Sequence, residues 1–168
     1  ERDKAIDTYK EIIERYPHSN EAQVAFQDLK SIYVDMGEVN EFALYAKSTT
    51  GLYTINQNEI DTLSYTAAEK MYGKGDTDGA KEKFEEYLTS HKDGAYRLNA
   101  HYYLGEIYYN EKEMDEALKN FEEVISYSDN KYTEPALIRA AGIYYNRTDY
   151  EEAGDLYKQL LVKSSNEE

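Results

Sequence analysis

Residues 102–125 read YYLGEIYYNEKEMDEALKNFEEVI, and the spacing of their small and aromatic side chains decides the fold. A small residue followed four positions later by an aromatic marks one turn of an amphipathic helix. A polar break at 110–113 separates two such periodic segments. The stretch therefore predicts a hairpin of two helices joined by a short turn. The residues that set its spacing are Leu104, Gly105, Tyr108, Ala117 and Phe121.

The same pattern recurs along the chain. Aligned on the small residue, its marks fall at positions 5, 42, 80, 117 and 153, which lie 37, 38, 37 and 36 residues apart. The copy at Phe42 is weaker, and the preceding Leu29 and Tyr33 place it. Small side chains let two helices approach closely, so we expect Gly105 and Ala117 at a helix crossing. A single hairpin cannot cover its own apolar faces, so successive hairpins should stack.

We expect an all-α fold, a right-handed superhelical solenoid of antiparallel helix hairpins that forms a single domain over residues 1–168. The chain starts in the middle of a repeat, which indicates a piece of a larger protein. The connection 48–57 contains Gly51 and β-branched residues that suit no helix, and we expect a displaced stack there. The predicted elements are a helix at 1–17 and hairpins at 20–49, 58–90, 94–128 and 133–163.

The series Leu104-Gly105, Tyr108, Ala117 and Phe121 resembles the tetratricopeptide repeat (TPR), and the resemblance covers essentially the whole chain. The period exceeds the family's usual 34 residues, and His101 replaces its large aromatic. The run from Ala5 to Pro17 is similar to bacterial cell-envelope members, the barrel-assembly lipoproteins and the periplasmic coordinators of the Tol-Pal system. This second resemblance favours the periplasm or cell envelope over the cytoplasm.

The composition limits the classes of partner. A net charge of −15, with 19 Lys and Arg dispersed among 34 acids, disfavours nucleic acid because polyphosphate would be repelled. The chain has no Cys, which removes disulfides and thiolate metal sites. No apolar run approaches the length of a bilayer span, so we expect no direct membrane insertion by this segment. A protein or peptide partner remains.

The first helix of each pair should line an inner, concave groove, where residues left over after packing can bind a partner. Tyrosine presents a rigid apolar face and a hydroxyl at small entropic cost. The alternative is that these tyrosines only pack between stacked hairpins. Family members that clamp a C-terminal carboxylate use Lys, Arg and Asn on this face, and the resemblance therefore implies a different ligand here. The predicted groove residues are Tyr65, Glu69, Tyr72, Tyr102, Glu106, Tyr109, Asn110, Tyr145 and Asn146.

Catalysis, cofactors and metals have little support in the sequence. The three His residues are far apart, and no phosphate-cradling glycine loop is present. The segment from Asp76 to Glu85 matches part of a calcium loop, but Lys74 takes the first ligand position. Paired acids such as Glu85-Glu86 and Glu122-Glu123 recur in register, which favours a solvated helix face over an acid/base pair. We expect no enzyme, no cofactor and no metal site.

The sequence thus predicts a non-catalytic protein-interaction module that binds a partner segment in a tyrosine-rich, acidic groove. The alternative is a structural component of a homo-oligomer or a cell-envelope complex. In that case the open ends of the solenoid would provide the contacts, and oligomerisation through them is possible in either reading.

Overall fold

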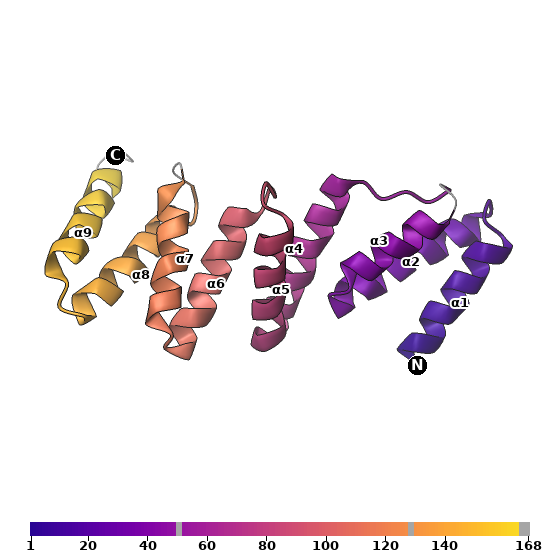
Figure 1. Ribbon diagram of the computed structural model, residues 1–168, viewed down its shortest axis with the longest axis horizontal. Helices are drawn as coiled ribbons and strands as arrows, with labels where there is room; N and C mark the ends of the chain where they lie inside the picture. The colour runs from indigo at the N-terminus through magenta and orange to yellow at the C-terminus, as the bar shows by residue number, and fades with distance from the viewer. Residues whose placement is uncertain (50–51, 128–129, 165–168) are drawn as a thin grey trace. The chain divides into compact units, whose positions relative to one another are not determined.

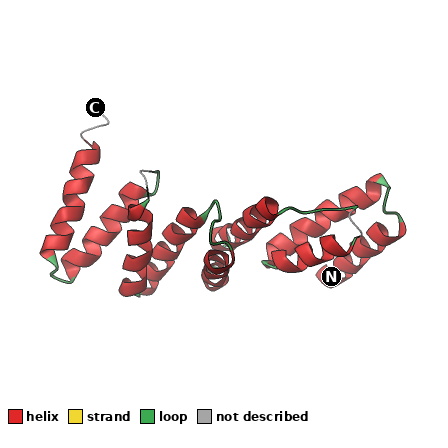
Figure 2. Cartoon of the chain, turned by 45° about the horizontal axis from the view of Figure 1, so that its top comes forward, coloured by secondary structure: helices red, strands yellow, loops and turns green. Residues whose placement is uncertain are grey.

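The structure is a computed structural model that describes residues 1–49, 52–127 and 130–164. Within these residues every regular element is a helix, nine in number, and no strand occurs (Figure 1, Figure 2). The chain divides into two compact units, Glu1–Lys83 and Phe84–Glu168. The predicted all-α fold of helix hairpins is confirmed.

Local capping residues set the ends of the helices in unit 1. The hydroxyl of Ser19 accepts a hydrogen bond from the Ala22 backbone N–H at 3.0 Å, which satisfies a donor that the first turn leaves free. Gly37 ends the second helix at φ 73°, a left-handed conformation that glycine adopts without strain. The helices are α1 (Arg2–Arg15), α2 (Asn20–Met36), α3 (Val39–Ser48), α4 (Gln57–Gly73) and the start of α5 (Thr77–Ser90).

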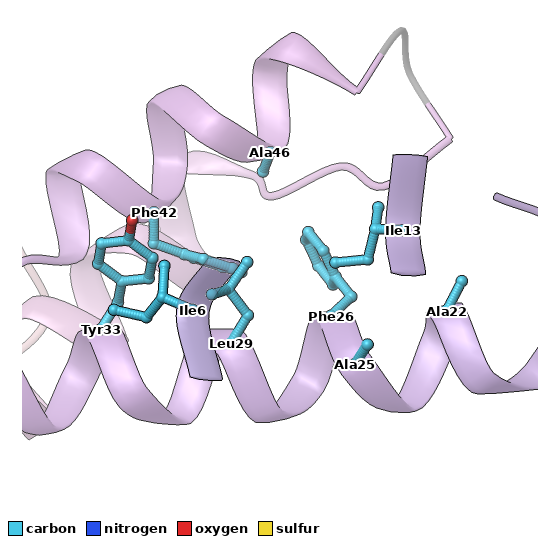
Figure 3. Close-up of a cluster of buried hydrophobic side chains, with 9 residues drawn as sticks. All are labelled: Ile6, Ile13, Ala22, Ala25, Phe26, Leu29, Tyr33, Phe42 and Ala46. Atoms are coloured by element: carbon cyan, nitrogen blue, oxygen red, sulfur yellow. The ribbon is translucent and has the colours of Figure 1, made fainter. Parts of the chain in front are cut away.

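The core of unit 1 forms where α1 and α3 lie against α2. Figure 3 shows Phe42 and Ala46 of α3 above the side chains of α2. The ring of Phe42 lies 5.0 Å from the ring of Phe26 and 6.0 Å from that of Tyr33, centroid to centroid. Phe42 therefore fills the position that the weak repeat copy assigned to a small residue. The buried members are Ile6, Ile13, Ala22, Ala25, Phe26, Leu29, Tyr33, Phe42 and Ala46.

Two ion pairs join α2 to α4 within unit 1. Lys30 Nζ lies 3.1 Å from Glu59 Oε1, and Lys70 Nζ lies 2.9 Å from Asp35 Oδ1. The hydrogen bond from Lys70 is the largest cause that lowers the pKa of Asp35. All four side chains are at least partly exposed to solvent, so these pairs align the helices more than they stabilise them.

Unit 2 repeats the hairpin twice. Gly105 of α6 lies under the ring of Phe121 of α7, because a Cβ added to Gly105 would come within 2.6 Å of that ring. Phe121 is fully buried, as are Leu137 and Ile143 of the next helix. At the predicted close crossing, the backbone of Gly105 therefore approaches the ring of Phe121. The helices are α6 (Arg97–Glu111), α7 (Met114–Ser126), α8 (Thr133–Asn146) and α9 (Tyr150–Ser164).

The predicted element boundaries need small corrections. Helix α6 begins at Arg97 instead of residue 94, because the Tyr96 backbone N–H donates to the Tyr87 hydroxyl at 2.9 Å and holds the preceding turn. Helix α4 is capped by Asn56, whose side chain accepts from the Glu59 N–H at 2.9 Å. The predicted end of a hairpin at 128 lies outside the described residues. The expectation of a single domain over both units stays a prediction.

Candidate functional site

The groove residues predicted on α4 lie in unit 1, and one of them is buried. Tyr65 is only 4% exposed, and its hydroxyl donates to Glu69 Oε1 at 2.8 Å. Its ring therefore packs inside the protein, as the alternative interpretation of these tyrosines states. Tyr72 is half-buried and Glu69 is exposed. The α4 set offers a partner less aromatic surface than the sequence pattern suggested.

In unit 2 the predicted residues of α6 meet α8 through an arginine. Arg139 donates two hydrogen bonds to Glu106, from Nε to Oε1 at 2.8 Å and from a terminal nitrogen to Oε2 at 3.0 Å. The guanidinium also lies 4.5 Å from the ring centroid of Tyr109, within the range of a cation–π contact. The bonds to Glu106 are the largest cause that raises the pKa of Arg139. We call the surface around this pair the α6–α8 face; its residues are Tyr102, Glu106, Tyr109, Asn110, Ile138, Arg139, Tyr145 and Asn146.

This pair gives Glu106 a different role from the one that the sequence predicted for it. The side chain of Glu106 is only 14% exposed, and both of its oxygens are bound by Arg139. A charge-assisted bidentate pair fixes both side chains. Glu106 is therefore a structural acceptor and does not offer a free carboxylate to the basic residues of a partner.

Tyr102 belongs to an aromatic cluster at the other end of the α6–α8 face. Its ring stacks on Tyr132 with centroids 4.5 Å apart and an interplanar angle of 26°. Tyr103 lies 5.8 Å from Tyr102 at a steep angle and stacks on Phe84 at 5.4 Å. Tyr102 is half-buried, so this predicted groove residue both packs between hairpins and presents part of its ring.

Tyr145 is the most open of the predicted aromatics. It is 57% exposed, and Ile138 seven residues earlier on α8 is 51% exposed. Residues at this separation lie on one side of a helix. Asn110 and Asn146 are also exposed. The structure thus brings the α6 and α8 members of the predicted set onto adjoining helices of one unit.

Two tyrosines at the same repeat position bind glutamates of the preceding helix. Tyr108 of α6 donates to Glu85, and Tyr144 of α8 donates to Glu122. Hydrogen bonding to Glu122, followed by burial, raises the pKa of Tyr144 to about 12 from its ordinary value of 10.0. Burial is the first cause that raises the pKa of Tyr108. The recurring acids are exposed, as predicted, but they also accept bonds that link successive hairpins.

We expect Tyr144→Phe to make the protein less sensitive to alkaline pH. The unfolded chain loses the tyrosine proton near pH 10, before the folded protein does. The stabilisation is therefore fully present below pH 10 and is lost as the pH rises towards 12. Urea unfolding followed by circular dichroism between pH 8 and 11.5 measures this loss. Tyr127→Phe, at a 43% exposed tyrosine, is the control, and equal alkaline losses in the two variants would contradict the assignment.

His101 has the structural role expected of it. Its Nδ1 lies 2.9 Å from Asn120 Oδ1, and the Asn120 amide donates to the Glu116 carbonyl at 2.9 Å. Because Asn120 Oδ1 accepts, Nδ1 carries the proton of the neutral ring. Burial is the largest cause that lowers the pKa of His101. A neutral, hydrogen-bonded imidazole thus takes the place of a packing aromatic.

The remaining motifs have local explanations. Asp76 Oδ1 accepts from the Gly79 backbone N–H at 3.1 Å, which is the geometry of a helix cap. Across the described ranges no group of three or more His, Asp or Glu side chains could hold a metal ion. The helices of the described part of the chain are all too short or too polar to cross a membrane.

Sequence reasoning missed Arg139. Its position, 33 residues after Glu106, is one repeat minus one helical turn, which brings it opposite Glu106 on the adjoining helix. An arginine 33 residues after Glu106 was the sequence feature that could have predicted this ion pair. A repeat pattern relates equal positions of successive repeats, whereas this contact joins unequal positions of two repeats.

The hairpins and the α6–α8 face define a helical-repeat protein. Residues 98–131 match a family model of the tetratricopeptide repeat, and residues 1–19 match a second model of that repeat. These matches, together with the fold, support the assignment of the chain to the tetratricopeptide-repeat superfamily. No curated protein sequence matches the chain.

Solved structures show the same fold. The crystal structure of MamA has a TM-score of 0.57 and 20% identity, and the match covers 99% of this chain and 90% of that one. A crystal structure of TPR-like repeats from a putative kinesin light chain of Podosopora anserina has a TM-score of 0.51 and 14% identity to this chain. The match covers 99% of this chain and 89% of that one. At these identities the likeness concerns the fold alone. Tetratricopeptide repeats are in general a non-catalytic fold for protein–protein interaction or scaffolding.

Proposed function

We propose that this protein is an interaction module whose α6–α8 face binds a segment of a partner protein. The observation that carries the proposal is the pair Ile138 and Tyr145, two large apolar side chains that stand more than half exposed on one side of α8. Aromatic residues supply much of the binding energy in protein interfaces because they bury a large area with few rotatable bonds. Asn110 and Asn146 add hydrogen-bonding groups beside them.

The Glu106–Arg139 pair supports this role by holding the two helices in register. Its bidentate hydrogen bonds connect α6 to α8, and the guanidinium also contacts Tyr109. A binding surface that is already ordered loses less entropy when a partner docks. In this proposal the α6–α8 face selects apolar and aromatic segments, and binding does not depend on a free carboxylate at Glu106.

We expect Ile138→Ser to reduce partner capture at least about fivefold while the fold is kept, since loss of an interface anchor costs about 1 kcal/mol or more. Immobilised protein and cross-linking in extracts of the source cells measure the capture. Val24→Ser is the matched control, because Val24 is 61% exposed on a helix of unit 1. The double variant Tyr102→Ala with Tyr109→Ala should abolish capture. Unchanged capture in both α6–α8 variants, with native circular dichroism, would refute the proposal.

A second candidate is assembly through α9. Tyr157, Leu161 and Val162 are 43%, 67% and 63% exposed, whereas Phe121, at the repeat position of Tyr157, is fully buried. An apolar helix face of this kind suits a protein contact. Light scattering over a concentration series separates the two candidates, because only assembly changes the molecular mass of the isolated chain.

A further inference from the structure

Two exposed tyrosines form an aromatic notch at the turn between α8 and α9. Tyr145 is 57% exposed and Tyr150 is 60% exposed. Their ring centroids are 5.4 Å apart and their planes meet at 63°. The rings thus form two apolar walls at a steep angle, each with a hydroxyl group. The two rings touch edge to face, and their outer faces stay open to pack against a compact, rigid apolar group.

Two amide side chains of the α6–α8 face can supply hydrogen bonds to a bound segment. Asn146 directly follows Tyr145, and Asn110 holds the same repeat position on α6. Both amides are exposed, and neither side chain bonds to another described residue. A helical ligand would leave these donors unused, because its backbone carbonyls are already paired. A polyproline II segment has no internal hydrogen bonds, so every one of its carbonyls can accept from such donors.

The charges around the notch select the residues that flank such a segment. Glu111, Asp149 and Glu151 are exposed beside Asn110 and Tyr150. The two arginines nearby are already paired, Arg139 with Glu106 and Arg147 with Asp115. Lys112 is the remaining cation nearby among the described residues, and its Nζ lies 5.9 Å from the ring centroid of Tyr109. In a chain of net charge −15, this surface attracts Lys or Arg and repels acidic segments.

We propose that the Tyr145–Tyr150 notch, with Asn110 and Asn146, binds a proline-rich segment in the polyproline II conformation that is flanked by basic residues. Prolines pack against the outer faces of the two tyrosine rings, and the amides donate to the carbonyls of the segment. The preformed conformation of such a segment keeps the entropic cost of binding small. This inference rests on the proposed function and adds the chemistry of the partner.

The test uses the full chain and a synthetic peptide of nine prolines flanked by two lysines at each end. A matched peptide carries glycine at alternate positions, which removes the polyproline II preference and keeps the charge. Isothermal titration should show saturable binding of the proline peptide only. Tyr145→Ala should weaken it about tenfold or more, whereas Tyr16→Ala, at a tyrosine 61% exposed in unit 1, should leave it unchanged.

Each other outcome overturns the inference. Absence of saturable binding, equal binding of the glycine-containing peptide, or unchanged affinity in Tyr145→Ala with a native circular dichroism spectrum would each do so. The capture experiment with Ile138→Ser tests the proposed function separately. If Ile138→Ser loses a partner while the proline peptide fails to bind, the α6–α8 face binds another kind of segment, such as a helix.

Discussion

Replacing Phe121 with alanine should lower the free energy of unfolding by about 3–5 kcal/mol. The ring is fully buried, and it lies so close to the backbone of Gly105 across the hairpin that a Cβ there would come within 2.6 Å of it. Because Gly105 has no side chain that could move into the space, the α6–α7 hairpin would keep most of the cavity. The loss thus combines the transfer of an aromatic ring to water with an unfilled void.

Tyr157→Ala is the matched control for Phe121→Ala. Tyr157 holds the same repeat position in the next hairpin but is 43% exposed, so its removal should cost clearly less. Urea unfolding followed by circular dichroism gives both values, and hydrogen exchange of the α6 and α7 amides assigns the loss to this hairpin. Equal losses in the two variants would show that burial at Phe121 does not set the stability of unit 2.

The repeat pattern predicts these packing residues because their spacing follows from helix geometry. Phe121 and Leu104 recur at fixed separations, and the structure buries both. Helix ends were predictable to within a few residues, since polar breaks and caps lie in the local sequence. The start of α6 was missed because it depends on Tyr87, nine residues before Tyr96. A contact of one side chain with a neighbouring backbone leaves no periodic signal.

The candidate site was less predictable than the fold. Tyr65 and Tyr102 occupy equal repeat positions, yet Tyr65 is buried and Tyr102 is half-buried in a cluster with Tyr132. Equal positions have unequal surroundings, because each hairpin meets a different neighbour. The same limit hid the partner of Glu106, since Arg139 belongs to the next repeat. Helical periodicity locates a face, but the exposure of each side chain depends on the residues opposite it.

The connection between α3 and α4 shows what a non-repeating segment can contribute. Tyr53 stacks on Phe26, with centroids 4.6 Å apart, and its hydroxyl donates to the Pro17 carbonyl at 2.9 Å. Open surface hollows of about 550, 240 and 610 Å³ border on this one residue. The side chain thus stands between three hollows of unit 1 and ties the connection to α2 and to the turn after α1.

Tyr53→Ala should therefore cost about 2–4 kcal/mol of unfolding free energy, somewhat less than a fully buried aromatic. The variant loses the ring stack on Phe26 and the hydrogen bond to the Pro17 carbonyl. Tyr53→Phe keeps the stack and should cost only about 1 kcal/mol for the lost hydrogen bond. Leu52→Ala, at a neighbouring side chain 46% exposed, is the control. Urea unfolding of the three variants ranks the contributions, and a cost for Tyr53→Ala no larger than that for Leu52→Ala would mean that the connection does not hold unit 1 together.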